Sequence, residues 1–567
     1  MRVTGPVVEI EGLHGARLLD LVAIGHRRLV GEVIALRGEL AVAQAHEYTG
    51  GLAPGAPVLL GSGPLSAELG PGLIGGVFDG MLRRLADVGE RIGPGAAAPT
   101  LRADRRWRFR PRARAGERIA GGAILGVVPE TEAIEARVLA PPGTAGRLEW
   151  IAAEGEYTVA EAIAAVDGRE LRLASPWPLR HPRPSALRLE ASVPLSTGQR
   201  ALDLLLPVAK GSTAAVPGGF GTGKTVLLQQ VAKWCDADVI VYVSCGERGN
   251  ELADLLEEVS GLQDPRTGHA LLDRTVLIAN ASDMPLMARG ISVHAGATVA
   301  EFYRDMGHDV LVIADSTSRW AEALREMGSR TGELPAEEGY PSSLAPMLAA
   351  FYERAGRVRT LAGGVGSVTI LGAVSPPGGD MAEPVTAHTG RFVRAVWSLD
   401  RDLAYARHYP AVSWTASSSR DVSPVAGWHE RAGDPDWAER RARAISLLAE
   451  ADRVQAVAEL VGATSLPDRE RIVALTGRLL REGVLQQSAL SDNDAWCAPA
   501  KQDALLAMVL SLHERAIELL GRGLSASRIE ELDLSEAVRA RDRLGPADAA
   551  GVEAVRDGLL AGLDALA

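Results

Sequence analysis

Short apolar runs separated by turns fill the first part of the chain. Four runs are long enough for one strand each, at residues 6–10, 17–23, 29–36 and 40–45. Many short strands at this spacing are typical of a small closed β-barrel. We therefore predict an N-terminal β-barrel over residues 1–70, followed by a connecting segment over residues 71–104.

A second β-rich pattern covers residues 105–184. Its apolar runs are short, as at 136–140 and 171–174, and a Pro-Pro-Gly turn interrupts it at 141–143. The proline-rich run 177–184 predicts a stiff, extended linker, because each proline fixes its own φ and biases the preceding residue away from helix. We predict a second, separate β-rich domain here.

Residues 185–430 show apolar strands alternating with helical stretches, the signature of a parallel α/β sheet. The runs 239–244, 275–279 and 310–314 are largely apolar, as expected of strands buried on both faces. We predict one α/β domain over this range, so the chain as a whole is a multidomain α/β protein.

Residues 431–567 are predicted to form a C-terminal helical bundle. Apolar residues recur with a helical period in three stretches, 437–449, 469–481 and 500–520. Plausible start signals for these helices are Asp436, Asp468 and Pro499.

Composition and charge narrow the possible functions. At roughly 150 residues per domain, 567 residues predict three or four domains. With 60 basic and 72 acidic residues, the net charge of −12 argues against non-specific binding of nucleic acid. Cys235, Cys245 and Cys497 are too scattered for a disulfide framework or a cysteine-rich zinc site, and they favour a reducing, cytoplasmic setting. No stretch approaches the ~18–20 apolar residues of a membrane span, and the N-terminus is unlike a signal peptide, so we expect any membrane part to belong to other chains.

The strongest chemical signal is Gly-Gly-Phe-Gly-Thr-Gly-Lys-Thr at 218–225, which fits the phosphate-loop (Walker A) pattern G-x-x-x-x-G-K-[ST] in full. An apolar strand at 214–216 precedes it, and a helix beginning near Lys224 follows. Backbone N–H groups and the positive end of the helix cradle phosphates in such loops, the lysine reaches the β- and γ-phosphates, and the hydroxyl of Thr225 binds Mg²⁺. The alternative is a glycine-rich turn with a chance lysine. The predicted nucleotide-binding residues of this loop are Gly218, Gly219, Phe220, Gly221, Thr222, Gly223, Lys224, Thr225 and Val226.

Asp315 directly follows the apolar run 310–314. A carboxylate at the carboxyl end of a buried parallel strand, next to a phosphate loop, is placed to hold Mg²⁺ through water. Taken alone, such an aspartate is more often a cap on the next turn. Because the phosphate loop is present, we predict Thr225 and Asp315 as the metal-binding residues.

Glu247 follows the predicted strand 239–244. Hydrolysis of a phosphoanhydride needs a group that orients and polarises a water in line with the γ-phosphate, and a carboxylate at this strand end is suited to that role. Arg248 and Arg319 would then neutralise charge on the transferring phosphoryl group. From the spacing alone, a surface cluster of ion pairs explains these residues equally well.

Other polar residues carry weaker signals. The eleven histidines show no metal-binding spacing, and His388 and His408 fit packing or surface positions better. The prolines and glycines of residues 375–380 predict a rigid loop whose role the pattern does not state.

Taken together, these motifs resemble a known family. Nearly from end to end, the chain is similar to the catalytic A subunits of V-type and archaeal-type (V/A) rotary ATPases. The segments that carry the resemblance are 218–225, 232–238, 241–251, 314–326, 337–341, 351–356 and 373–380, with 68–73 and 128–131 before them. The β-rich domain at 105–184 resembles the insertion that distinguishes A subunits from F-type β subunits and export ATPases. Lys224 distinguishes the chain from the non-catalytic B subunits, which lack this lysine.

The resemblance implies roles for individual residues. Glu247 matches the glutamate that activates the attacking water; Lys224, Arg248 and Arg319 match phosphate contacts; Thr225 and Asp315 match Mg²⁺ positions. Tyr409 takes the place of a phenylalanine that stacks on adenine, and its ring offers the same face. A later phenylalanine of the adenine pocket is Leu490 here, which packs against adenine without a π face. Further departures, at 342–343, 346–347, 418–421 and Gly290, bear on partner contacts more than on catalysis.

The resemblance also implies an architecture and partners. Residues 185–430 would form a RecA-like P-loop domain that binds ATP or ADP with Mg²⁺, and residues 105–184 an inserted domain. The chain would alternate with B subunits in a hexameric ring, where the B subunit supplies an arginine finger. Central and peripheral stalks would connect this ring to the membrane ion-translocating sector, on the cytoplasmic face, and no nucleic acid would be bound.

The function expected from the resemblance is ATP hydrolysis or synthesis, coupled to proton or sodium transport through rotation of a central stalk. One alternative is a non-catalytic, nucleotide-binding structural paralogue of the same ring, motivated by the altered base-pocket and contact positions. A second is a ring-shaped nucleic-acid translocase built on a RecA-like core, against which the net charge of −12 and the extra β-rich domain both count.

Overall fold

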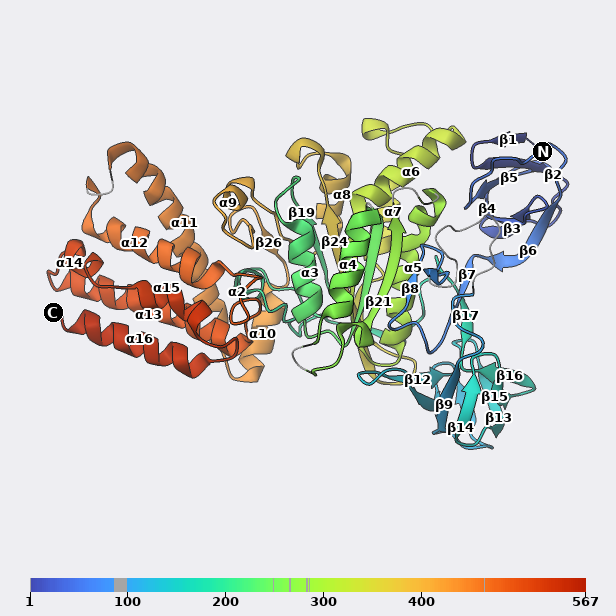
Figure 1. The fold of residues 1–567 in the computed structure, drawn as a ribbon, viewed down its shortest axis with the longest axis horizontal. Coiled ribbons are helices and arrows are strands. Elements are labelled where there is room, and N and C mark those ends of the chain that lie inside the picture. Colours follow the sequence, from blue (N-terminus) through green and yellow to red (C-terminus); the bar gives the residue numbers. More distant parts are fainter. Residues whose placement is uncertain are drawn as a thin grey trace.

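The computed structural model describes residues 2–85, 99–247, 249–264, 267–281, 284, 286–462 and 465–566. The molecule is elongated, with C-terminal helices at one end, a large sheet in the middle and two β-rich parts at the opposite end (Figure 1). Among the described residues, no helix combines the length and the apolar character needed to cross a membrane.

The N-terminal part is a six-stranded antiparallel sheet with the strand order β1-β2-β5-β4-β3-β6. Its strands are β1 (Arg2–Thr4), β2 (Val7–Glu11), β3 (Asp20–Ile24), β4 (Leu29–Arg37), β5 (Leu40–Ala45) and β6 (Val58–Pro64). Alternate side chains point to one face, so Val8, Ile24 and Val33 are buried in a single apolar core. The four strands predicted here correspond to β2, β3, β4 and β5.

The inserted β-rich part consists of two four-stranded sheets, ordered β10-β13-β15-β16 and β12-β11-β9-β14. Its strands are β9 (Arg106–Pro111), β10 (Arg118–Ala120), β11 (Ile124–Pro129), β12 (Glu135–Leu139), β13 (Ala145–Ile151), β14 (Gly155–Thr158), β15 (Ala162–Val166) and β16 (Arg169–Arg172). In β9, exposed arginines alternate with the buried Trp107 and Phe109, which is the pattern of a strand with one face on a core.

A short two-stranded stem connects this part to the rest of the chain. The strand that enters, β7 (Ser66–Leu69), pairs antiparallel with the strand that leaves, β17 (Ser175–Pro178). Glu130, at the end of β11, accepts hydrogen bonds from the N–H groups of Gly72 and Ile74 at 2.7 and 3.1 Å. Complete burial raises the pKa of this carboxyl. The segments 68–73 and 128–131 singled out in the sequence therefore meet and fix the inserted part in place.

The central sheet has ten strands, and its main path runs β26-β25-β19-β24-β22-β20-β21-β8. The parallel core strands are β19 (Thr213–Pro217), β24 (Val365–Val374), β22 (Asp309–Asp315), β20 (Val239–Glu247) and β21 (Thr275–Ala281). The remaining strands are β8 (Val77–Phe78), β18 (Leu187–Leu189), β23 (Gly356–Arg359), β25 (Ala395–Val396) and β26 (Ser418–Ser419). Because β8 pairs with β21, the segment 71–104 is more than a connection: it supplies a strand of this sheet.

Helices cover this sheet and connect its strands (Figure 1). They are α2 (Arg200–Leu205), α3 (Lys224–Trp234), α4 (Gly249–Gly261), α5 (Leu286–Asp305), α6 (Thr317–Thr331), α7 (Leu344–Tyr352), α8 (Pro384–Phe392), α9 (Arg401–Tyr405) and α10 (Val422–Ala432). Single 3₁₀ turns lie at η1 (Leu271–Arg274), η2 (Glu337–Gly339) and η3 (Pro377–Gly379). Since the core strands are parallel, the residues that follow β19, β20, β22 and β24 gather at one edge of the sheet.

The C-terminal part is helical, as predicted. Its helices are α11 (Trp437–Val461), α12 (Asp468–Leu479), α13 (Pro499–Gly521), α14 (Ala526–Glu530), α15 (Ser535–Arg543) and α16 (Ala549–Asp564), and a π-helical turn, η5 (Leu480–Leu485), continues α12. Pro499 is the first residue of α13, where a missing N–H costs nothing. The Asp436 side chain makes no capping hydrogen bond. Asp468 lies inside the first turn of α12 rather than before it, where its charge faces the positive helix end.

Candidate active site

The phosphate loop leaves β19 and ends where α3 begins, as its sequence pattern requires. A Cβ atom at Gly218 would lie 2.8 Å from the Thr222 hydroxyl and 2.9 Å from Leu399 Cβ, so only glycine fits there. Gly223 has φ +83°, a left-handed conformation that glycine adopts without strain. The Thr222 hydroxyl is buried and donates to Gly219 O at 2.9 Å, which closes the loop on itself.

Lys224 extends its ammonium group across the base of this loop. Its Nζ donates to Gly218 O at 2.9 Å, to Val374 O at 3.0 Å and to Ser375 Oγ at 2.6 Å. The first acceptor belongs to the phosphate loop, and the other two lie at the end of β24. The lysine is thus positioned between two neighbouring strands of the sheet, where a polyphosphate bound in the loop would meet its charge.

Asp315 ends β22 at the same edge of the sheet. It is only 3% exposed, and its Oδ2 accepts a hydrogen bond from Tyr242 Oη at 3.1 Å, which fixes the carboxylate. Thr225, the second residue of α3, is exposed at the mouth of the loop. Mg²⁺ takes oxygen ligands and commonly combines one or two protein oxygens with phosphates and water. A hydroxyl and a fixed carboxylate at one sheet edge therefore fit this ion.

The predicted catalytic residues lie on neighbouring elements. Glu247 is the last residue of β20, the strand beside β22, and Ser244 of β20 is paired with Asp315. The Glu247 side chain and the whole of Arg248 lie outside the described residues. Arg319 is in the first turn of α6, and its Nη1 forms an ion pair with Glu322 at 3.0 Å. This guanidinium is half exposed.

A cavity of about 420 Å³ adjoins the phosphate loop. Gly223, Val226 and Tyr409 line it, and a Cβ atom at Gly223 would lie 3.5 Å from the Tyr409 ring. Leu490 also lines it and is 98% exposed. The lining further includes Gln199, Leu227, Gln230, Leu399, Arg407, Pro410, Ala411, Gln486, Gln487, Ser488, Ala489 and Arg541. An aromatic ring and an aliphatic side chain in one cavity next to a phosphate loop are suited to a planar base.

His408 precedes Tyr409 and is buried. Burial, assisted by the charges of Arg481 and Arg541, lowers the pKa of its imidazole to about 4. The ring is therefore neutral near pH 7, and it packs edge-on against Trp414 with centroids 6.0 Å apart. This agrees with the packing role predicted for His408. His388 lies 3.6 Å from Glu337, between α8 and η2.

Comparison with known proteins tests the resemblance. Models of the ATP synthase alpha/beta family match at residues 1–60 (beta-barrel domain) and 198–419 (nucleotide-binding domain). The alpha/beta subunit barrel-sandwich domain matches at 98–180, and the C-terminal domain of V and A type ATP synthase at 426–527. Over 549 residues, the chain is 47% identical to the A subunit of the A-type ATP synthase of Desulfurococcus sp. (strain SY), covering 95% of this chain and 94% of that protein. It belongs to the ATP synthase alpha/beta family.

Within this family, the similarity is to A subunits. The V-type ATP synthase alpha chain of Anaeromyxobacter dehalogenans (strain 2CP-C) is 49% identical over 567 residues, covering 99% of this chain and 97% of that protein. The resemblance to V/A-type A subunits is thus confirmed. So is the fold class, since the four matched domains correspond to a β-barrel, an inserted β-rich domain, a RecA-like nucleotide-binding domain and a helical C-terminal part.

One solved structure extends the likeness of fold. The assembled ATPase EscN, from the type III secretion system of enteropathogenic E. coli, aligns with a TM-score of 0.64 at 22% identity. The alignment covers 90% of this chain and 98% of EscN. At this identity the comparison supports the shared fold alone.

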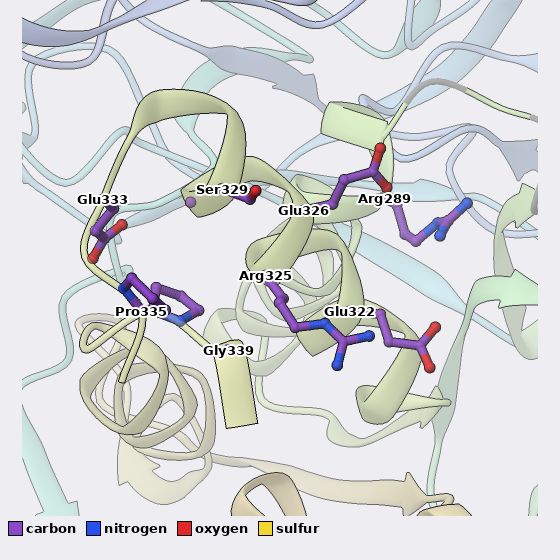
Figure 2. A pocket seen from close by; sticks show the side chains of 10 residues that line it. Arg289, Glu322, Arg325, Glu326, Ser329, Glu333, Pro335 and Gly339 are labelled. Carbon is purple, nitrogen blue, oxygen red and sulfur yellow. The ribbon is translucent and has the colours of Figure 1, made fainter. Parts of the chain in front are cut away.

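A larger cavity of about 740 Å³ lies over α6, away from the phosphate loop. Figure 2 shows Glu322, Arg325 and Glu326 on α6, with Arg289 on the neighbouring helix and Glu333 on the following loop. Arg325 stacks over the Tyr340 ring at 5.0 Å. None of the predicted site residues lines this cavity; the nearest link is Glu322, which forms the ion pair with Arg319. The lining mixes acidic and basic side chains and does not resemble a nucleotide-binding site.

Several residues at the site were missed by the sequence analysis. Ser375 holds Lys224 and is itself held, because its N–H donates to Ser318 Oγ at 2.8 Å. The rigid loop at 375–380 thus begins as a support for the phosphate-loop lysine. Arg541 reaches the 420 Å³ cavity beside the phosphate loop from α15, near the end of the chain. Ser375 lies in the segment 373–380 that carries the resemblance, but the sequence analysis assigned it no role, and Arg541 had no motif of its own.

Proposed function

We propose that this chain is the catalytic subunit of a V/A-type rotary ATPase, and that it hydrolyses or forms ATP at the phosphate loop. The observation that carries the proposal is the position of Lys224. Its ammonium group is held by three oxygens between the phosphate loop and the end of β24, at the sheet edge that also carries Asp315 and Glu247. Family membership supports nucleotide binding by this domain.

Binding would divide the nucleotide between the two halves of the site. The loop N–H groups of residues 218–223 and the N-terminus of α3 would hold the phosphates, with Lys224 on the β- and γ-phosphates. The base would enter the cavity between Tyr409 and Leu490. Thr225 and Asp315 would hold Mg²⁺, which would offset the charge of the bound phosphates.

Hydrolysis would proceed by in-line attack of water on the γ-phosphorus, without a covalent enzyme intermediate. Glu247 orients the water and takes up its proton as the new P–O bond forms and the bond to the β-phosphate oxygen breaks. Lys224, Arg248 and Arg319 offset the charge on the transferring phosphoryl group. The reverse sequence, driven by torque from a rotor, joins ADP and phosphate.

The site would be completed in a ring. A B subunit would alternate with this chain in a hexamer and supply an arginine finger, and central and peripheral stalks would couple the ring to a membrane sector that moves protons or sodium. The chain would lie peripherally at the cytoplasmic face of a membrane and act as an ion-transporting ATP hydrolase or synthase. Support comes from the near full-length match to A-type and V-type subunits of ATP synthases.

The test is steady-state ATP hydrolysis by this chain alone and in a ring assembled with its cognate B subunit. We expect little activity alone and strong activity in the ring, because a neighbour's arginine contributes about 10³–10⁵ in rate in related enzymes. Glu247→Gln should abolish hydrolysis while nucleotide binding persists. Glu257→Gln removes an exposed carboxylate on the adjacent helix α4 and serves as the control. An assembled ring that binds ATP yet remains silent would support the structural paralogue instead.

A further inference from the structure

One wall of the base cavity comes from a loop that joins η5 to α13. Residues 486–490 of this loop line the cavity, as does Tyr409. A backbone hydrogen bond joins this wall to the tyrosine directly, because the Gln487 N–H donates to Tyr409 O at 2.7 Å. The Gln487 side chain is also held in place by hydrogen bonds, since it accepts from the Arg200 N–H at 3.0 Å and donates to Gly198 O at 2.8 Å.

A buried carboxylate lies behind this wall. Asp494 is fully buried, and its Oδ2 accepts a hydrogen bond from the Ser488 N–H at 2.8 Å. The same carboxylate forms ion pairs with Arg200 at 2.7 Å and with Arg541 at 2.5 Å. Charged side chains are seldom buried without partners, and this one is shared by two guanidinium groups.

The two arginines come from different parts of the molecule. Arg200 is the first residue of α2 in the nucleotide-binding domain, and Arg541 lies on α15 of the C-terminal part. Both donate to the same carbonyl, Gln486 O, at 2.6 and 3.3 Å respectively. Arg541 also lines the base cavity. The cavity wall is therefore held between two parts of the molecule by one carboxylate and one shared carbonyl.

A buried lysine fixes the position of helix α15. Lys501 of α13 is fully buried, and its ammonium group donates to Arg541 O at 2.8 Å and to Leu544 O at 2.9 Å. Two guanidinium groups thus share a single carboxylate, and Lys501 fixes the backbone that carries one of them. Removing that negative charge would leave Arg200 and Arg541 adjacent and uncompensated, and their repulsion would push α2 and α15 apart.

We propose that Asp494 is a positioning residue for the base half of the nucleotide site. By pairing with Arg200 and Arg541 it holds the 486–490 wall at a fixed distance from Tyr409, so that base binding and the placement of α15 depend on each other. The inference rests on the proposed function, because it assumes that the cavity beside the phosphate loop receives the base.

Asp494→Asn tests the proposal, since it keeps the side-chain shape and an acceptor oxygen for Ser488 but removes the shared charge. The full chain would be titrated with MgADP and, separately, with magnesium tripolyphosphate, which has no base. We expect Asp494→Asn to weaken ADP binding about tenfold or more. Tripolyphosphate binding should change by less than about twofold, because the phosphate loop is a separate contact region.

Two further variants guard against a general loss of stability. Glu536→Gln breaks an exposed ion pair of α15 with Arg543, at 2.6 Å, and should leave both affinities unchanged. If Asp494→Asn does not fold, Arg541→Gln is the second test, because it removes a partly exposed ion-pair partner of Asp494 and should also weaken ADP binding. Arg541→Lys keeps the positive charge and should recover part of the ADP affinity that Arg541→Gln loses.

The outcomes separate this inference from the proposed function. Equal losses for ADP and tripolyphosphate, or no loss for either, would overturn the positioning role while leaving the proposed function intact. A parent chain that binds neither ligand would overturn both.

Discussion

The phosphate loop and the base cavity meet at Gly223, but the chain builds them differently. On the phosphate side, Lys224 has three oxygen acceptors within 3.0 Å and Asp315 is 3% exposed. On the base side, Tyr409 is 42% exposed and Leu490 is 98% exposed. One half is thus rigidly held before any ligand arrives, and the other presents open apolar surface.

The difference follows from how each half is assembled. The phosphate half lies at one edge of a buried parallel sheet, whose strands fix the positions of the residues that follow them. The base half combines three distant stretches of chain, around Tyr409, residues 486–490 and Arg541, and depends on side-chain ion pairs to align them. Preorganised charge is what phosphoryl transfer requires, whereas holding a base tolerates more adjustment.

The largest expected effect comes from removing the positive charge of Lys224 from the phosphate half of the site. Lys224→Ala should lower ATP hydrolysis in the assembled ring by about 10³-fold or more, equivalent to about 4 kcal/mol, because the transferring phosphoryl group loses its fixed cation. Steady-state assays at saturating ATP would measure this. Lys233→Ala, at the last turn of the same helix, is the control and should stay close to the parent rate. Comparable losses in both variants would contradict the special position of Lys224.

A second prediction concerns how the stability contributed by His408, next to Tyr409 in the base half, depends on pH. The His408 imidazole has its pKa lowered to about 4, chiefly by burial. The unfolded chain takes up this proton near pH 6.5, so the stability contribution is complete above that pH and is lost as pH falls toward 4. Between pH 7 and pH 5 we expect a loss of about 2 kcal/mol from this residue.

Denaturant unfolding of the parent and of His408→Gln at both pH values would measure this contribution. The variant should lose less stability on acidification, since glutamine does not titrate. Through His408, ADP binding by the folded chain should change little between pH 7 and pH 5, because the imidazole stays mostly neutral above its pKa of about 4. An identical pH dependence of stability in both proteins would show that the buried imidazole does not account for the acid sensitivity.

The same contrast explains what could be predicted from the sequence. The core strands β20, β21 and β22 agree closely with the predicted runs 239–244, 275–279 and 310–314. Strands buried on both faces must be apolar throughout, so they stand out in a hydrophobicity pattern. The phosphate loop was equally visible, because its glycines are demanded by the backbone geometry around Gly218 and Gly223.

The base half was less accessible to sequence reasoning. Tyr409 and Leu490 were recognised only through the resemblance to A subunits, and the support of Lys224 by Ser375 carried no motif. Asp494 shows the physical reason. An aspartate in a polar stretch predicts an exposed loop, yet it is fully buried by two arginines, one nearly three hundred residues before it and one in a later helix. Such pairings depend on which distant segments meet, which no local pattern records.

The smallest predicted effect comes from a substitution that adds an aromatic side chain to the base half. Leu490→Phe adds a second aromatic face to the cavity lined by Tyr409, and aromatic contacts contribute about 0.5–1.5 kcal/mol beyond the area they bury. We therefore expect MgADP to bind about two- to tenfold more tightly, with tripolyphosphate affinity unchanged. Leu460→Phe alters a similarly exposed leucine, 87% exposed on α11 and absent from the cavity lining, and serves as the matched control. Tighter binding of both ligands, or an equal gain in the control, would mean that the effect does not arise from stacking on the base.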